Sequence, residues 1–415
     1  MRKAVGIALI DQAVLSLFNL GLNLVLIRLA APAEFGRFIF AAAVVLVLTS
    51  LQNALVSTPL SIMIPGRALD EQQEVVTTIV SFDVLFRLCA ALAAPIICLL
   101  TSHTWDFLAA TVAVTFTTLG RETARSVILA YERQKDCLRL DLTAILASIA
   151  AITALWTVLS PAVASLTGIA IGNLAAILMY ATVSLRQRLN VSETISAYRM
   201  KCWGDTQWSL IGAGTTEVQY RSYVFGLEVF RDATALASVQ AGRLLLGPLP
   251  LVVGAWGRVA RPAMARYLAT GDLRGVVRLT AQGLAYVMAL GIVYCLALYI
   301  CWPLAEAWVF RGKYQDVGFM TLAWGAYMLI VIGHMVLSVP LQAAMKLKEL
   351  AQVTMITALL SCLLLIGLAT SVPAIYAVLA LTAAEVVALA WIAILVMRLS
   401  NGQHTAVVQT AAGVP

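Results

Sequence analysis

Long apolar segments recur along the whole chain and constrain its fold more than any other feature. Of the 415 residues, 61% are hydrophobic and 12% are charged, and the mean hydropathy is +0.91. Soluble domains carry roughly 25% charged residues. Windows of roughly 20 apolar residues cross a bilayer as helices, and their continuous rather than alternating pattern disfavours a transmembrane barrel. The sequence therefore predicts an all-α integral membrane protein.

Twelve apolar windows are long enough to be transmembrane helices. We expect them near residues 5–30, 36–62, 77–101, 105–131, 138–160, 162–185, 204–229, 234–257, 279–303, 317–345, 350–371 and 372–397. With a cytoplasmic amino terminus, nineteen Lys and Arg residues fall in cytoplasmic segments and five on the opposite side. This bias predicts that both termini are cytoplasmic. It also explains the formal charge of +7 without nucleic-acid binding.

The longest polar stretch divides the windows into two sets of six. We predict an amino-terminal lobe at 1–190, a cytoplasmic linker at 191–203, a carboxy-terminal lobe at 204–398 and a cytoplasmic tail at 399–415. "LIDQAVLSLFNLG" opens the first lobe and "WGDTQWSLIGAGT" opens the second, so each begins with Asp and Gln at a cytoplasmic helix start. Such halves are related by an axis along the membrane normal.

Catalytic and metal-binding signatures are missing from the sequence. The seven Cys residues are scattered without a CxxC pair, and the three His residues have no metal-ligand spacing. No GxSxG, HExxH, Walker A or GxGxxG motif occurs. We therefore expect no enzyme activity, no resident metal and no cofactor.

Charged residues inside the predicted helices carry most of the functional information. Each costs roughly 2.5–3.5 kcal/mol at mid-bilayer on insertion scales, so it persists where it faces a cavity or a partner. Asp83 with Arg87, and Glu217 with Arg221, are spaced four apart on one helix face. Arg243 has no acid nearby in sequence, and Glu385 is a lone acid in the last helix. The alternative interpretation is that these groups only fix helix packing or snorkel to the surface.

The first helix carries a polar stripe at spacings of four, three and four: Gln12, Ser16, Asn19 and Asn23. Polar side chains that face lipid cost free energy, whereas polar side chains that face a water-filled cavity stay hydrated and do not. The alternative is hydrogen bonding between helices without transport. Gln52 and Asn53 add amides on the second helix. We infer a polar cavity between the halves that is richer in Arg than in unpaired acid. Such a cavity suits an anionic substrate, because guanidinium binds phosphate in a bidentate way.

Residues 9–64 resemble the opening of bacterial polysaccharide-export flippases, the Wzx-type proteins of the multidrug/oligosaccharidyl-lipid/polysaccharide superfamily. The resemblance rests on Asp11-Gln12, Asn19, Arg28, Glu34-Phe35-Gly36 and the stretch from Gln52-Asn53 to Thr58-Pro59-Leu60. The segment 237–266, "ASVQAGRLLLGPLPLVVGAWGRVARPAMAR", resembles helix eight of that family. In letters the resemblance covers about a third of the chain.

The resemblance implies two six-helix lobes in a V-shaped, MATE-like arrangement in the bacterial inner membrane. It implies transfer of undecaprenyl-diphosphate-linked sugar repeat units, for O antigen or exopolysaccharide, from the cytoplasmic to the periplasmic leaflet. Membrane lipid, a polysaccharide polymerase and the export machinery are then the expected partners. By position, Arg28 and Arg243 match arginines of the family. Because a charge inside the membrane costs free energy, we add Arg87 and Arg221 as candidate phosphate ligands from their position in the helices. For the same reason, Asp83, Glu217 and Glu385 are candidate sites for coupling to H⁺ or Na⁺.

Three other interpretations stay open at this point. A drug/cation antiporter of the same superfamily would favour an acidic cavity. A membrane polysaccharide polymerase, ligase or glycosyltransferase would need a large outer loop or metal-binding acids, and the sequence shows neither. A scaffold that transports nothing would leave the stripe on the first helix without a role.

Overall fold

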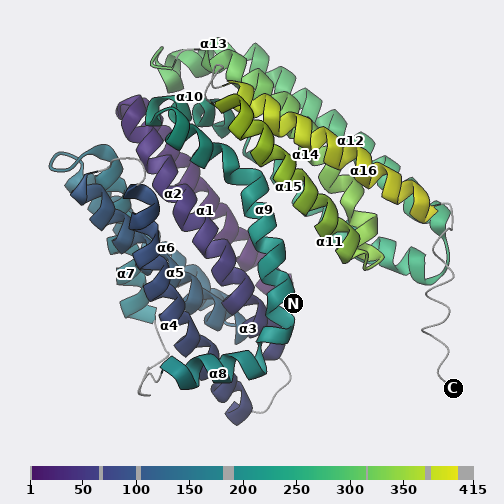
Figure 1. The fold of residues 1–415 in the computed structure, drawn as a ribbon, viewed down its shortest axis with the longest axis horizontal. Coiled ribbons are helices and arrows are strands. Elements are labelled where there is room, and N and C mark those ends of the chain that lie inside the picture. Colours follow the sequence, from purple (N-terminus) through teal and green to yellow (C-terminus); the bar gives the residue numbers. More distant parts are fainter. Residues whose placement is uncertain are drawn as a thin grey trace. The chain divides into compact units, whose positions relative to one another are not determined.

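The computed structural model describes residues 2–64, 69–99, 104–180, 191–314, 316–369 and 375–400. Every regular element within these ranges is a helix (Figure 1). They are α1 (Arg2–Leu29), α2 (Pro32–Gln52), the π-helix η1 (Asn53–Ser57), α3 (Thr58–Met63), α4 (Leu69–Leu99), α5 (Trp105–Ala130), α6 (Gln134–Leu155), α7 (Pro161–Tyr180), α8 (Val191–Lys201), α9 (Trp203–Phe230), α10 (Ala233–Leu244), α11 (Pro248–Ala269), α12 (Leu273–Ile300), α13 (Trp302–Ala305), the π-helix η2 (Glu306–Phe310), α14 (Val317–Ala343), α15 (Leu347–Ala369) and α16 (Ile375–Ser400). The predicted all-α membrane fold is confirmed.

The apolar helices make the chain a multi-pass membrane protein. Within the described ranges, nine helices are long and apolar enough to span a membrane, and the bent pair α10 and α11 makes a tenth. The two remaining predicted windows correspond to α5 and α9. These are 26 and 28 residues long but carry more charge than an ordinary span. Their polarity indicates that they face protein or water rather than lipid.

Two compact units divide the chain. Unit 1 comprises residues 1–217 and 232–237, and unit 2 comprises residues 218–231 and 238–415. These units group residues by contact, whereas the predicted lobes divide the chain by a repeat. The bounds of the lobes therefore stay a prediction. Residues 401–415 of the predicted tail lie outside the described residues.

In unit 1, α7 packs closely against both α5 and α6. The contact with α6 depends on Gly168 and Gly172, a small-xxx-small pair of the kind that lets membrane helices approach. A Cβ atom added at Gly172 would lie 2.3 Å from the carbonyl oxygen of Ala144, and one at Gly168 would lie 2.9 Å from the backbone nitrogen of Ile152. These distances leave no room for a side chain without moving backbone.

The substitution Gly172→Ala is therefore expected to force α6 and α7 apart and to destabilise unit 1 by about 1–3 kcal/mol, as overpacking does. Thermal unfolding of the purified protein in detergent measures the effect. Gly367→Ala on α15 is the matched control, because a Cβ there meets no atom within 4 Å. Equal midpoints for the two variants would contradict the packing described.

The predicted linker contains the helix α8, which its polarity did not indicate. Tyr198 anchors α8 to unit 1: its ring stacks on Phe82 at 3.8 Å and its hydroxyl donates to the carbonyl oxygen of Leu55 at 2.6 Å. Leu55 lies in η1, where the change of helical repeat alters the backbone hydrogen bonding. Burial raises the pKa of Tyr198 to about 12, so the hydroxyl remains a donor at neutral pH.

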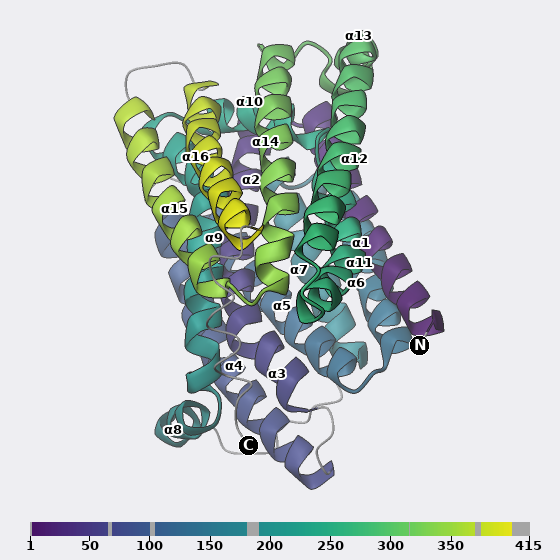
Figure 2. The same cartoon turned by 90° about the vertical axis from the view of Figure 1, so that its right-hand side faces the viewer.

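Unit 2 is built around α14, which packs against α11, α12 and α16. Figure 2 shows α12 and α14 side by side, with α13 at their upper end. The single span predicted at 234–257 is instead two helices, α10 and α11, bent by 51°. The bend falls at Gly247 and Pro248. Proline provides no backbone N–H to continue the preceding helix, so the break follows from the sequence.

Candidate functional site

Asp83 lies at the centre of a buried polar cluster in unit 1. Its carboxylate is fully buried and forms an ion pair with Arg87, Nε to Oδ2 at 2.8 Å, as the i,i+4 spacing predicted. Gln52 donates to Oδ1 at 2.6 Å, and Thr123 donates to Oδ2 at 2.7 Å. Both carboxylate oxygens are therefore satisfied by α2, α4 and α5 together.

This cluster changes the interpretation of Gln52. Its amide also donates to the carbonyl oxygen of Leu119 and contacts the hydroxyl of Thr123, and the residue is 1% exposed. Gln52 thus holds Asp83 in place. Asn53, the next residue, is exposed. The guanidinium of Arg87 lies 5.5 Å from the ring centroid of Phe116, and its side chain is 13% exposed.

A second buried cluster joins α1, α5 and α6. Arg125 binds Asp11 at 2.7 Å and Asp141 at 3.0 Å, and Arg121 binds Glu122 at 2.8 Å. Arg121, Glu122 and Arg125 on α5 form a group with a net positive formal charge. In the structure two further carboxylates join it, so three acids face two arginines. Asp141 was missed because it lies 16 residues from its nearest partner, Arg125, in the sequence.

Cys137 adds a sulfur atom to this second cluster. Its Sγ and the carboxylate oxygens of Asp11 and Asp141 lie within 4.8 Å of one another. Arg125 already bridges the two carboxylates, so a guanidinium supplies the positive charge that a metal ion would bring. The contacts do not favour a metal here.

The polar stripe of α1 lies on an accessible surface. Gln12 and Asn19 are exposed, while Ser16, Asn23 and Arg28 are partly buried. The amide of Asn23 donates to the carbonyl oxygen of Asn19 at 2.7 Å, within the helix. Two of the four stripe residues are therefore accessible and two are partly covered. Its role in substrate binding stays a prediction.

Glu217 lies on α9 and is the last residue of the 1–217 segment of unit 1. Its carboxylate accepts a hydrogen bond from Ser50 at 2.6 Å. Arg221, one turn later, belongs to unit 2 and is partly buried. The predicted pairing of these two side chains stays a prediction.

Glu385 forms the centre of a polar cluster in unit 2. It is 1% exposed, and one carboxylate oxygen faces Nδ1 of His334 in a short contact. The other oxygen accepts from Gln219 at 2.9 Å. Three helices, α9, α14 and α16, therefore meet at one acid. Sequence reasoning considered His334 only as a metal ligand, so its pairing with Glu385 was not foreseen.

Arg243 lies in an aromatic environment in the same unit. Its Nη1 donates to the hydroxyl of Tyr223 at 2.8 Å, and that hydroxyl donates to Gln240 at 2.6 Å. The guanidinium lies 5.1 Å from the ring centroid of Trp324. No acidic side chain pairs with Arg243 within the described ranges. The site is therefore a partly exposed positive charge, held by rings and hydroxyls.

Comparisons with known proteins find similar folds among solved structures. No protein-family model and no curated protein matches the chain. An inward-facing multidrug resistance MATE transporter of the MOP superfamily superposes with a TM-score of 0.70 at 11% identity, covering 93% of this chain and 95% of that one. The lipid II flippase MurJ, in an inward closed conformation, gives 0.72 at 13% identity, covering 94% and 87%.

A MOP superfamily transporter from Pyrococcus furiosus, described as having a binding pocket of reversed polarity, gives a TM-score of 0.59 at 12% identity, with 95% of each chain covered. These similar structures are transporters and a flippase, not enzymes. The chain is thus a multi-pass membrane protein with the fold of the MOP superfamily transporters.

Proposed function

We propose that the protein is a Wzx-type flippase, which moves an undecaprenyl-diphosphate-linked oligosaccharide from the cytoplasmic to the periplasmic leaflet of the bacterial inner membrane. The proposal rests on one observation: Arg243 has no acidic partner within the described ranges. An arginine without an acidic partner costs free energy at membrane depth and attracts an anion. A diphosphate supplies that anion and cannot cross hydrocarbon uncompensated.

The same observation disfavours the antiporter. A cationic drug would meet repulsion at Arg243, which has no acidic partner among the described residues. The flippase among the structural neighbours acts on lipid II, which supports a lipid-linked cargo. Arg28 and Arg221 complete the proposed set of phosphate ligands, and rocking of the two halves would alternate access to them.

For coupling, we propose that a proton bound at Glu385 and His334 resets the transporter. Hard cations are held by cages of oxygen ligands. Here both carboxylate oxygens face nitrogen atoms, of His334 and Gln219. Acidic and histidine side chains within membrane helices form the proton relays of pumps and transporters. Tyr220 and Tyr327 lie within electrostatic range of Glu385. Asp83 and Glu217 are the alternative coupling sites.

Gene deletion and complementation in the host test the proposed function. We expect the deletion strain to lose surface polysaccharide and to accumulate lipid-linked repeat units in the cytoplasmic leaflet, and the wild-type gene to restore both. Normal polymer with altered drug sensitivity would indicate an antiporter instead. Repeat units that reach the outside but fail to lengthen would indicate a polymerase.

A further inference from the structure

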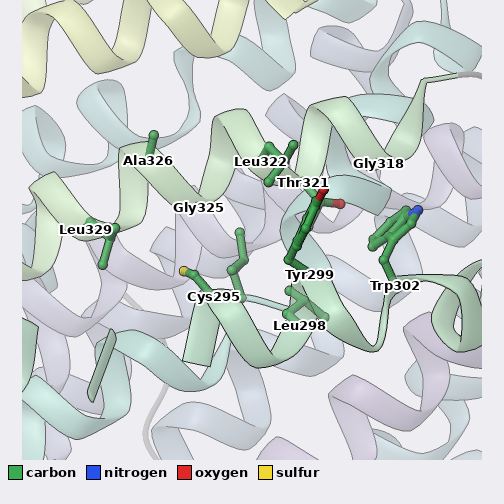
Figure 3. Close-up of a pocket in the computed structure, with 11 residues that line it drawn as sticks. Cys295, Leu298, Tyr299, Trp302, Gly318, Thr321, Leu322, Gly325, Ala326 and Leu329 are labelled. Carbon is green, nitrogen blue, oxygen red and sulfur yellow. The ribbon is translucent and has the colours of Figure 1, made fainter. Parts of the chain in front are cut away.

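An apolar groove lies between α12 and α14, with α13 at one end (Figure 3). Its volume is about 290 Å³. Two polar side chains in its wall are already engaged: Thr321 donates to the carbonyl oxygen of Val317, and Trp302 donates to Glu306. The groove therefore offers hydrocarbon contacts and no free hydrogen-bonding group from these two side chains.

Small residues on α14 create the groove. Gly318 lies next to Trp302 of α13 and Gly325 lies next to Cys295 of α12, where longer side chains would fill the space. A Cβ atom at Gly325 would lie 3.6 Å from Sγ of Cys295, which is ordinary contact. Tyr299 and Leu322 at the rim are 63% and 51% exposed, so the groove opens to the surface of two membrane-spanning helices.

The groove adjoins the cationic site of the same unit. Leu246 lines it two residues after the end of α10, and its backbone nitrogen donates to the carbonyl oxygen of Arg243 at 3.0 Å. On α14, Trp324 packs by Arg243, while its neighbour Gly325 lines the groove. The groove and Arg243 are thus linked through adjacent residues, Trp324 and Gly325 on α14 and Leu246 after α10.

We propose that this groove binds the polyprenyl tail of the lipid-linked substrate while Arg243 binds its diphosphate. The inference rests on the proposed function. Charge complementarity at Arg243 selects a phosphate-bearing amphiphile, and the groove begins three residues from that charge. A polyprenyl diphosphate combines both chemistries in one molecule. The groove is thereby a specificity site for the lipid carrier rather than for the sugar.

Photolabelling of the full-length protein in liposomes tests this assignment. The probes are a long-chain and a ten-carbon prenyl diphosphate, each with a diazirine on its terminal isoprene unit. We expect the long probe to label peptides of α12 and α14 in the wild type. In Gly325→Leu, labelling should fall about tenfold, the value for excluding about two methylene groups from an apolar site.

Controls separate the possible failures. Gly367→Leu, on an exposed face of α15 where a Cβ meets nothing within 4 Å, should label as wild type does. Binding of the ten-carbon probe should survive Gly325→Leu and be lost in Arg243→Ala. If neither probe binds the wild type, the proposed function fails. If both bind but label other helices, or if a diazirine phosphatidylglycerol labels the groove and is not displaced by the long probe, only the tail assignment is overturned.

Discussion

Arg243→Ala is expected to reduce transport of the lipid-linked repeat unit by about 10- to 100-fold. A hydrogen bond to a charged group contributes about 1.5–3 kcal/mol, and each 1.4 kcal/mol is a factor of ten. Surface polysaccharide and lipid-linked intermediates in the complemented deletion strain give the measurement. The loss should be largest for this arginine, because Tyr223 and Trp324 hold its guanidinium in a fixed place without an acid to neutralise it.

Two variants make this result interpretable. Arg261→Ala removes an exposed arginine from α11 of the same unit and should leave transport unchanged. Arg243→Lys keeps the charge but not the bidentate geometry, so it should fall between wild type and alanine. Wild-type transport by Arg243→Ala at equal membrane level would contradict the proposed anion site.

Glu385→Gln is expected to abolish the response of transport to a pH gradient. In proteoliposomes, a gradient of one pH unit is worth about 1.4 kcal/mol per proton, so it should shift the wild-type distribution of substrate by up to about tenfold. The glutamine keeps the shape and a hydrogen bond with Gln219 but cannot exchange a proton. Its distribution should therefore stay the same with and without the gradient.

His334→Gln should give the same phenotype, and the double variant should be no worse than either single variant, because the two residues act as one unit. Glu349→Gln, at the start of α15, controls for the loss of an acid elsewhere in unit 2. A response to a sodium gradient alone, or a full pH response in Glu385→Gln, would exclude this pair as the coupling site.

The sequence predicted what depends on local spacing. Asp83 and Arg87 share a helix face and do form an ion pair, and apolar length located the membrane helices. The bend between α10 and α11 was missed, although Gly247 and Pro248 signal it. Tyr198 gave no signal, since its contacts with Phe82 and Leu55 lie more than 100 residues away.

Pairings across helices could not be derived from spacing. Gln52 reaches Asp83 from another helix, and Asp141 reaches Arg125 in the same way. A buried charge shows that a partner exists, because its cost in the membrane must be offset. It does not show which partner. His334 illustrates this: a lone acid in α16 predicted a hydrogen-bonding neighbour, but only the packing of α14 identified it.

The central claim is that this protein moves a lipid diphosphate, and a translocation assay in liposomes tests it most directly. The purified full-length protein is reconstituted with an undecaprenyl-diphosphate oligosaccharide that carries a fluorophore on its sugar. A membrane-impermeant reductant then reports which leaflet holds the label. We expect label sealed in the inner leaflet to become reducible with the wild type and to stay protected with Arg243→Ala. Equal protection in wild-type and protein-free liposomes would contradict the claim.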